Sequence, residues 1–206
     1  MSRVRIKICG ITSAEDAAAA GAAGADAIGM IFWSRSPRVV AQDRAADIAR
    51  SVPPLVARVG VFVDESPETV AAVVAGVGLY VVQLHGNENA ADFRSAGVPI
   101  VRAVALTNDE DVARAIALPS EVTVLVDAHD PERKGGTGAT ASWARAAKVA
   151  AVRPVMLAGG LTPANVADAI RAVHPWAVDV SSGVESAPGK KDVTKMKAFV
   201  AAVRSL

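Results

Sequence analysis

Two side chains capable of acid–base chemistry end apolar runs that lie far apart in the sequence. Cys9, the only cysteine, ends the run VRIKIC, and Asp127 ends the run VTVLVD. A thiol becomes a useful base when a cation lowers its pKa, and a carboxyl group becomes a useful acid near neutral pH when desolvation raises its pKa. Such a pair suits the removal of a proton from carbon while an oxygen is protonated. Two ordinary roles compete with this hypothesis, since a buried cysteine often serves as a small apolar residue and a strand-end aspartate as a helix cap.

Other apolar runs also end in polar residues, namely Arg35, Arg38, Asp64, Gln83, His85, Arg102 and Asp179. Arg38 could bind a substrate carboxylate through its bidentate guanidinium group, or it could be a solvated loop residue. His85 could orient a substrate or be structural. His85, His129 and His174 stand apart, and Cys9 has no second thiol nearby, so we expect no metal site.

The last two apolar runs are followed by loops that are typical of phosphate sites. They read AGGLTPAN, which contains Gly160, and DVSSGVES, which contains Ser181 and Ser182. Glycine lets backbone N–H groups approach phosphate oxygens, and serine hydroxyls add donors. Ordinary turn chemistry is the alternative. A third loop, HDPERKGGTGAT at 129–140, is long for its position and could be a lid or a tolerated insertion.

Eight strand-then-helix units position these residues. The strands are expected at 4–9, 26–32, 58–63, 80–85, 99–104, 122–127, 154–159 and 177–182. Ser13, Ser66-Pro67 and Thr162-Pro163 are expected to start helices. An open doubly wound sheet is the alternative, but CGITSAED after the first strand lacks a G-x-G-x-x-G turn. We therefore predict an α/β protein, a single-domain (β/α)8 TIM barrel over 1–206, with its site at the carboxyl ends of the strands.

Composition restricts the partners. The chain has 206 residues, 51% of them hydrophobic, and a net charge of +1, so it has no bias toward nucleic acid or an anionic membrane. One cysteine excludes an intrachain disulfide and fits a reducing compartment. Neither a signal-peptide core nor an apolar run long enough to span a membrane is present in the sequence, so we expect a cytoplasmic protein.

The motifs together resemble one enzyme family over nearly the whole chain. KICGIT, GADAIGMIFWSRSPRVV, VGVFVDES, VVQLHGNE, GGTG, LAGGLTPANV and DVSSGVESAPGKKD are similar to phosphoribosylanthranilate isomerase, an enzyme of tryptophan biosynthesis. The resemblance implies a (β/α)8 barrel without a cofactor, active as a monomer or homodimer on a small phosphorylated substrate. It implies an Amadori rearrangement of N-(5-phosphoribosyl)anthranilate to 1-(2-carboxyphenylamino)-1-deoxyribulose 5-phosphate.

The resemblance also implies a role for each matching residue. Cys9 matches the general base and Asp127 the general acid, and Arg38 matches the arginine that binds the anthranilate carboxylate. The other matches are His85, a strand-four histidine; Asp179, near the ribose hydroxyls; and Gly160, Ser181 and Ser182 in the phosphate loops. The chain departs from the family after GGTG, where Ala139 replaces a lysine and Ser142 an acid. That departure affects the expected anchoring of a lid at 129–138.

Three other functions are alternatives to this isomerisation. A histidine-pathway barrel isomerase would need an aspartate in place of Cys9 and a second phosphate loop. Indole-glycerol-phosphate synthase would need a catalytic lysine and glutamate on early strands, where the sequence supplies only Lys7. A barrel that only binds a phosphorylated ligand would not need the thiol.

Overall fold

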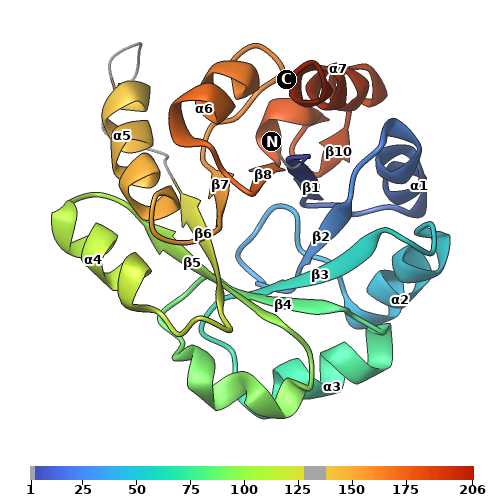
Figure 1. Cartoon of the computed structure of the whole chain (residues 1–206). Helices are drawn as coiled ribbons and strands as arrows, with labels where there is room; N and C mark the ends of the chain where they lie inside the picture. Colours follow the sequence, from blue (N-terminus) through green and yellow to red (C-terminus); the bar gives the residue numbers. More distant parts are fainter. Residues whose placement is uncertain (1–2, 128–137) are drawn as a thin grey trace.

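The chain forms a closed eight-stranded parallel barrel surrounded by helices (Figure 1). The computed structural model describes residues 3–127 and 138–206. The strands are β1 (Arg5–Cys9), β2 (Ala27–Ile31), β3 (Ala57–Phe62), β4 (Val81–Leu84), β5 (Ile100–Ala105), β6 (Thr123–Asp127), β7 (Val155–Ala158) and β8 (Ala177–Val180). Each strand pairs with its sequence neighbours, and β1 pairs with β8 to close the ring. The predicted (β/α)8 barrel is confirmed.

A helical segment follows each strand of the barrel. These segments are α1 (Ala14–Ala23), α2 (Gln42–Ser51), α3 (Pro67–Val77), η1 (Ala90–Ala96), α4 (Asp109–Ala117), α5 (Gly138–Ala150), α6 (Val166–Val173) and α7 (Val193–Arg204). Two of the predicted caps are confirmed, since the side chains of Ser13 and Ser66 accept hydrogen bonds from the first turns of α1 and α3. No helix among residues 3–127 and 138–206 is long and apolar enough to cross a membrane.

Two local predictions need correction, and the structure adds one feature that was not predicted. The fourth helical segment, η1, is a 3-10 helix, consistent with its short span between Asn89 and the left-handed Gly97. Helix α6 begins at Val166 and not at Thr162-Pro163, because the Asn165 side chain accepts from the Thr162 N–H and donates to the Gly160 carbonyl, which holds the preceding residues in a turn. After β8 the chain forms a short helix, η2 (Ser182–Val184), and a hairpin of β9 (Glu185–Ala187) and β10 (Lys190–Lys191).

The barrel interior has an apolar part and a polar part. An inner apolar cluster is supplied by β5 to β8 and consists of Val101, Ala103, Leu125, Met156, Ala158 and Ala177. In contrast, β1 carries the buried Lys7, and β4 and β8 carry the buried Gln83 and Asp179. A larger apolar cluster fills the layer between the barrel and the helices. The buried ion pair of the barrel interior thus lies at the β1–β8 seam, and Gln83 lies across the ring from it.

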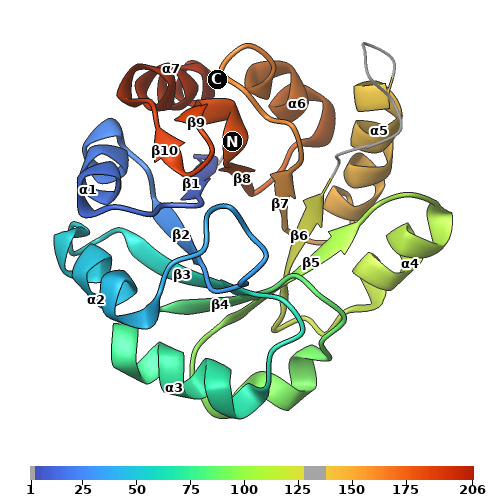
Figure 2. The same cartoon turned by 180° about the vertical axis from the view of Figure 1, so that it is seen from behind.

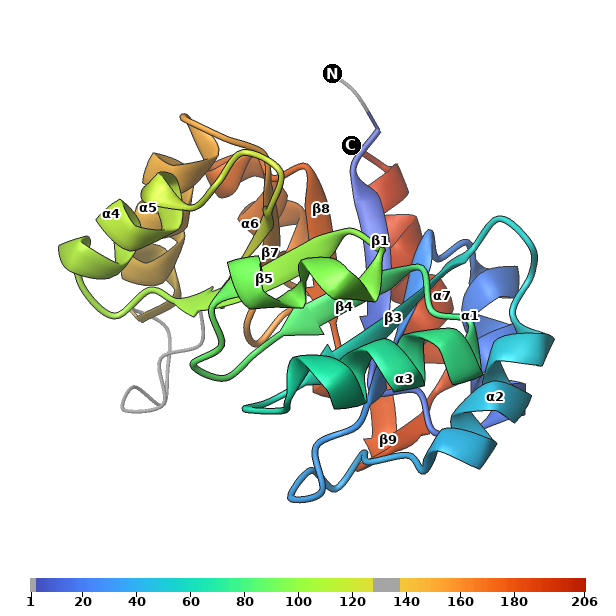
Figure 3. The ribbon, with the colours of Figure 1, turned by 90° about the horizontal axis from the view of Figure 1, so that it is seen from below.

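The carboxyl ends of the strands form one face of the molecule. In Figure 2 the loop between β2 and α2 lies across the centre of this face. Figure 3 shows β9 and the same loop at one end of the barrel, with both chain termini at the other end. The candidate site therefore lies opposite the termini.

Asp111 holds the start of α4, and its removal should destabilise the protein. Its Oδ2 accepts hydrogen bonds from the Thr107 N–H at 2.8 Å, the Thr107 hydroxyl at 2.5 Å and the Asn108 N–H at 3.1 Å. Asp111→Ala should lower the free energy of unfolding by about 1–2 kcal/mol in urea at neutral pH, as expected for a lost helix cap. Asp109→Ala, at an exposed position of the same helix, serves as the control.

The contribution of Asp111 should also depend on pH. The hydrogen bonds from Thr107, together with those from Arg114 and Asn108, lower the pKa of Asp111 from 3.8 to about 2. The stabilisation is therefore complete above the unfolded-state pKa and is lost as the pH falls toward 2. The difference in stability between wild type and Asp111→Ala should shrink over that window. A difference that stayed constant would contradict the role of the carboxylate.

Candidate active site

One cavity of about 410 Å³ brings together all eight residues to which the family resemblance assigns a role. The residues are Cys9, Arg38, His85, Asp127, Gly160, Asp179, Ser181 and Ser182. Cys9 ends β1 and Asp127 ends β6, so β7 and β8 separate them on the shorter path around the ring. They reach the same cavity from different sides of the barrel mouth.

The thiol lies deep in this cavity beside a buried lysine. Cys9 is 7% exposed, and Lys7 is 1% exposed and points into the barrel from the same strand. Burial raises the pKa of the Cys9 thiol above its ordinary value, while the charge of Lys7 and a hydrogen bond from it act in the opposite direction. The sequence places both side chains on one face of β1, as expected from strand alternation.

Lys7 forms an ion pair with Asp179 at 2.9 Å between Nζ and Oδ1. The two residues are paired in register across β1 and β8. Burial disfavours the charge of Lys7, but Asp179 and Cys9 together raise its pKa, so the lysine stays protonated. The resemblance assigned Asp179 to the ribose hydroxyls, whereas one of its oxygens is used by Lys7.

Arg38 enters the cavity from the loop after β2, but Glu185 occupies much of its guanidinium group. Arg38 Nε lies 2.8 Å from Glu185 Oε1, and Nη2 lies 2.7 Å from Oε2. Lys191 Nζ also lies 2.7 Å from Glu185 Oε1. These contacts come from the β9–β10 hairpin, and they leave Arg38 Nη1 outside the ion pair. The hydrogen bond to Glu185 raises the pKa of Arg38.

Five charged groups therefore surround the thiol end of the cavity with one excess positive charge. Lys7, Lys191 and Arg38 are cationic, and Asp179 and Glu185 are anionic, so three positive charges face two negative ones. An anionic ligand or a thiolate would balance the excess.

Gly10 makes room for Arg38. A Cβ at Gly10 would lie 2.6 Å from Arg38 Cδ and 3.0 Å from Ser181 Oγ, and the residue has a φ of +74°. Any other residue would therefore displace the arginine and strain the backbone. The space beside Gly10 is therefore occupied by the side chain of Arg38.

Gln83 contacts the ring of His85, and burial favours the neutral form of that ring. Gln83 Nε2 lies 3.1 Å from His85 Nδ1, and burial lowers the pKa of His85. When the amide donates to Nδ1, the proton of the neutral ring resides on Nε2. Gln83 is 2% exposed, and its Oε1 has no hydrogen-bond partner among the described residues. His85 can thus donate one hydrogen bond to a ligand.

The two predicted phosphate loops contact each other. Gly183 lies against the carbonyl of Leu161 so closely that a Cβ would collide with it. Ser181 Oγ is buried without a hydrogen-bond partner in the part of the chain that the structure describes, and it lines the cavity. This hydroxyl and the nearby Gly160 and Ser182 can serve an oxyanion.

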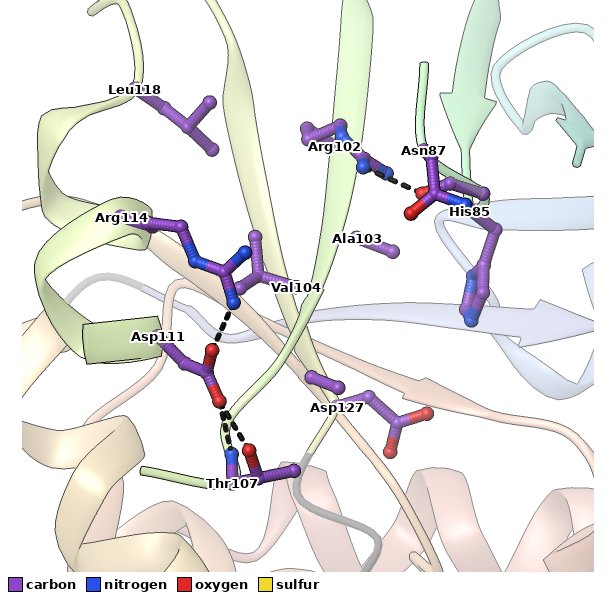
Figure 4. Close-up of a pocket in the computed structure, with 12 residues that line it drawn as sticks. His85, Asn87, Arg102, Ala103, Val104, Thr107, Asp111, Arg114, Leu118 and Asp127 are labelled. Carbon is purple, nitrogen blue, oxygen red and sulfur yellow. Dashed lines mark hydrogen bonds and ion pairs between the residues drawn. The ribbon is translucent and has the colours of Figure 1, made fainter. Parts of the chain in front are cut away.

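A second cavity of about 430 Å³ adjoins the first, and His85 and Asp127 border both (Figure 4). Arg102 lines only the second cavity, where its guanidinium donates to the carbonyls of Leu84 and Gly86. Arg35 and Asp64 lie outside both cavities. A position at the end of a strand therefore did not by itself distinguish the residues that line the first cavity from those that do not.

Sequence reasoning missed Trp33, Glu185 and Lys191. Trp33 lines the cavity with Ile31 and Val61 and gives it an apolar wall beside Arg38. Trp33 lies in the GMIFWSRSPRVV motif and Glu185 in DVSSGVES, so the motifs contained both residues, but nothing in the sequence assigned them contacts. Ser142, which stands where the resemblance implies an acid, is buried, with 3% of its surface exposed. The expected lid at 129–138 falls almost wholly outside the described residues.

No group of three His, Cys, Asp or Glu residues within 3–127 and 138–206 is arranged to hold a metal ion. A parallel eight-stranded barrel with a polar cavity at the carboxyl ends of its strands is the arrangement of (β/α)8 enzymes.

Comparisons with known proteins narrow this class. A family model described as "N-(5'phosphoribosyl)anthranilate (PRA) isomerase" matches residues 6–202. The N-(5'-phosphoribosyl)anthranilate isomerase of Pseudomonas paraeruginosa is 46% identical over 206 residues, which are 100% of this chain and 97% of the relative. That of Thiobacillus denitrificans is 46% identical over 203 residues, or 98% of each chain. The chain belongs to the N-(5'-phosphoribosyl)anthranilate isomerase family, whose members interconvert an aldose and a ketose.

Solved structures agree with this assignment. The Thermotoga maritima phosphoribosylanthranilate isomerase aligns with a TM-score of 0.90 and 43% identity, over 98% of this chain and 100% of the other. A phosphoribosylanthranilate isomerase in complex with reduced 1-(o-carboxyphenylamino)-1-deoxyribulose 5-phosphate aligns with a TM-score of 0.87 and 40% identity, over the same shares.

Proposed function

We propose that this chain isomerises N-(5-phosphoribosyl)anthranilate with Cys9 as the general base and Asp127 as the general acid. Family membership places the reaction, an Amadori rearrangement that gives 1-(2-carboxyphenylamino)-1-deoxyribulose 5-phosphate, in tryptophan biosynthesis. The observation that carries the residue assignment is that a thiol and a carboxyl group from separated strands line one cavity.

The reaction needs one proton donor and one proton acceptor. Asp127 donates a proton to the furanose ring oxygen, the bond from that oxygen to C1′ breaks, and the nitrogen lone pair forms a Schiff base. The Cys9 thiolate then takes the proton from C2′. The electrons of that C–H bond form a C1′–C2′ double bond, and the electrons of the C=N bond return to nitrogen. The resulting enolamine tautomerises to the ketose.

The remaining groups suit the two ends of the substrate. The phosphate is assigned to Gly160, Ser181 and Ser182, because the buried Ser181 hydroxyl lines the cavity without a partner among the described residues. The anthranilate carboxylate is assigned to Arg38. The aromatic ring of anthranilate is assigned to the apolar wall at Trp33. The sugar lies between the phosphate and the anthranilate, and it is assigned to His85 and Asp179 as binding groups.

Arg38→Lys should weaken substrate binding more than it slows the chemical step. Lysine keeps the positive charge but loses the planar group that Glu185 holds in place. We expect KM to rise about tenfold, corresponding to about 1.4 kcal/mol, with a much smaller change in kcat. Steady-state kinetics measure both.

Arg35→Lys is the matched control, because Arg35 is an exposed arginine of the same loop and does not line the cavity. Its kinetic constants should match those of the wild type. A large fall in kcat at unchanged KM in Arg38→Lys would contradict a binding role for Arg38.

We also propose that the enzyme works in the cytoplasm as a monomer or homodimer. The single cysteine fits a reducing compartment, and one solved relative is described as generated monomers of the dimeric phosphoribosylanthranilate isomerase from Thermotoga maritima, with a TM-score of 0.86 and 39% identity. Light scattering of the purified protein measures its mass, and a larger assembly would contradict the proposal.

The function is tested with the purified chain and N-(5-phosphoribosyl)anthranilate, by following loss of the substrate and formation of the ketose. Expression in a tryptophan auxotroph that lacks the isomerase should restore growth without tryptophan. An inactive, folded wild-type protein would refute the proposed activity.

A further inference from the structure

The interior of the barrel contains a buried lysine for which the proposed reaction has no direct use. Lys7 pairs in register with Asp179 on β8, and Cys9 pairs with Gly29 on β2. Lys7 and Cys9 are two residues apart on one strand, so both side chains point into the barrel. Lys7, Cys9 and Asp179 thus lie close together at the β1–β8 seam, where Cys9 and Asp179 line the cavity.

Gly29 allows the lysine and the thiol to lie side by side. A Cβ at Gly29 would lie 2.8 Å from Cys9 Sγ and 3.1 Å from Lys7 Cε, so both side chains occupy the space that a larger residue would fill. Lys7 Nζ donates a hydrogen bond to Asp179 Oδ1 at 2.9 Å, and the lysine side chain lies beside the Cys9 thiol in the space above Gly29. An ammonium group has three donors, so it can serve both partners at once.

Four charged groups act on Cys9 from the surrounding elements. They are Lys7 on β1, Asp179 on β8, Lys191 on β10 and Arg38 in the loop after β2. Lys191 and Arg38 are both bound to Glu185, which offsets their charge at the thiol. Lys7 is the cation that shares the strand of Cys9, and its side chain lies next to the thiol against Gly29.

We propose that Lys7 is a positioning residue that stabilises the thiolate of Cys9, and that Asp179 fixes the lysine in place and limits its effect. This inference rests on the proposed role of Cys9 as the base. When Cys9 loses its proton, the Lys7 ammonium group offsets the new negative charge. This matters because the buried thiolate is poorly solvated by water. Asp179 competes with the thiolate for the same ammonium group, and it therefore limits the stabilisation that Lys7 gives to Cys9.

The single cysteine allows a direct test without substrate. The rate of alkylation by iodoacetamide as a function of pH reports the thiolate of Cys9 alone, because the chain contains no other thiol. Lys7→Met keeps the approximate length of the side chain and removes its charge. At about pH 8 it should slow alkylation at least about tenfold, corresponding to an increase of one unit in the thiol pKa.

Two further variants separate charge from packing. Lys191→Met removes another buried, ion-paired lysine, and alkylation should change less than about threefold because Lys191 mainly serves Glu185. Asp179→Asn removes the anion that raises the thiol pKa, so alkylation should become faster, the opposite of the effect in Lys7→Met. This variant also tests the proposal if Lys7→Met does not fold. Ultraviolet absorbance of the thiolate gives the same titration independently of reagent access.

Kinetics give a second readout. Lys7→Met should lower kcat at unchanged KM, and the acid limb of its pH profile should move to higher pH together with the thiol titration. An unchanged titration in folded Lys7→Met, an equal shift in Lys191→Met, or slower alkylation in Asp179→Asn would overturn the proposal. None of these results would remove Cys9 as the base. Retained activity in a Cys9 variant would instead refute the proposed base, whatever the titration of the thiol.

Discussion

Cys9→Ala is expected to abolish isomerisation while the barrel stays folded. Alanine has no group that can accept the C2′ proton, and loss of a positioned general base costs about 10²–10⁴ in rate. The substitution removes one sulfur atom from a site that borders a cavity, so we expect only a small loss of stability. Turnover of the substrate measures activity, and circular dichroism with urea unfolding measures the fold.

Cys9→Ser provides the matched comparison. A serine hydroxyl keeps a polar group at the end of β1 but ionises far less readily than a thiol, so the variant should also be nearly inactive. If either variant kept a kcat close to that of the wild type, the C2′ proton would have to go to another group, and the base would be assigned wrongly.

The same assignment fixes the direction of the pH dependence. The base acts as a thiolate, and burial raises the pKa of Cys9 in the free enzyme. The ratio kcat/KM should therefore rise with pH toward the raised thiol pKa and fall as the pH decreases.

Asp127→Asn is expected to abolish isomerisation by blocking the opening of the sugar ring. Asparagine has nearly the same shape as aspartate but cannot donate an acidic proton to the ring oxygen. We expect a loss of at least about 10²-fold in kcat with substrate affinity largely kept. Steady-state kinetics, with binding of a substrate analogue measured by calorimetry, separate the two effects.

Asp64→Asn is the control for this second substitution. Asp64 follows β3 at the same end of the barrel but does not line the cavity. Its left-handed φ of 52° is tolerated by asparagine, so the fold should survive. Equal losses of activity in both variants would point to a general effect of charge at the barrel mouth and would contradict a specific role for Asp127.

The sequence predicted the barrel well because its signals are local. Each expected strand overlaps an observed one to within about two residues at either end, since continuous apolar runs between helices are typical of buried parallel strands. The prediction failed where a side chain outside the periodic pattern decides the local structure. Asn165 moves the start of α6 to Val166, and no periodicity reveals that contact.

The candidate site was only partly accessible from sequence. Strand ends identified Cys9 and Asp127, because parallel strands of a barrel bring their carboxyl ends to one face. The ion pairs could not be predicted, since Arg38 and Glu185 are 147 residues apart and meet only after the β9–β10 hairpin has formed. Residue types at strand ends show which groups are available, but the fold decides which of them neutralise one another.

The seam between β1 and β8 also has a consequence for how the protein acquires activity during synthesis. Lys7 is translated before its partner Asp179, which follows 172 residues later. Until β8 has been made and docks beside β1, Lys7 lacks its ion-pair partner, and Glu185 and Lys191 are translated later still. Activity should therefore appear in a single step as the ring closes, without a partly active precursor.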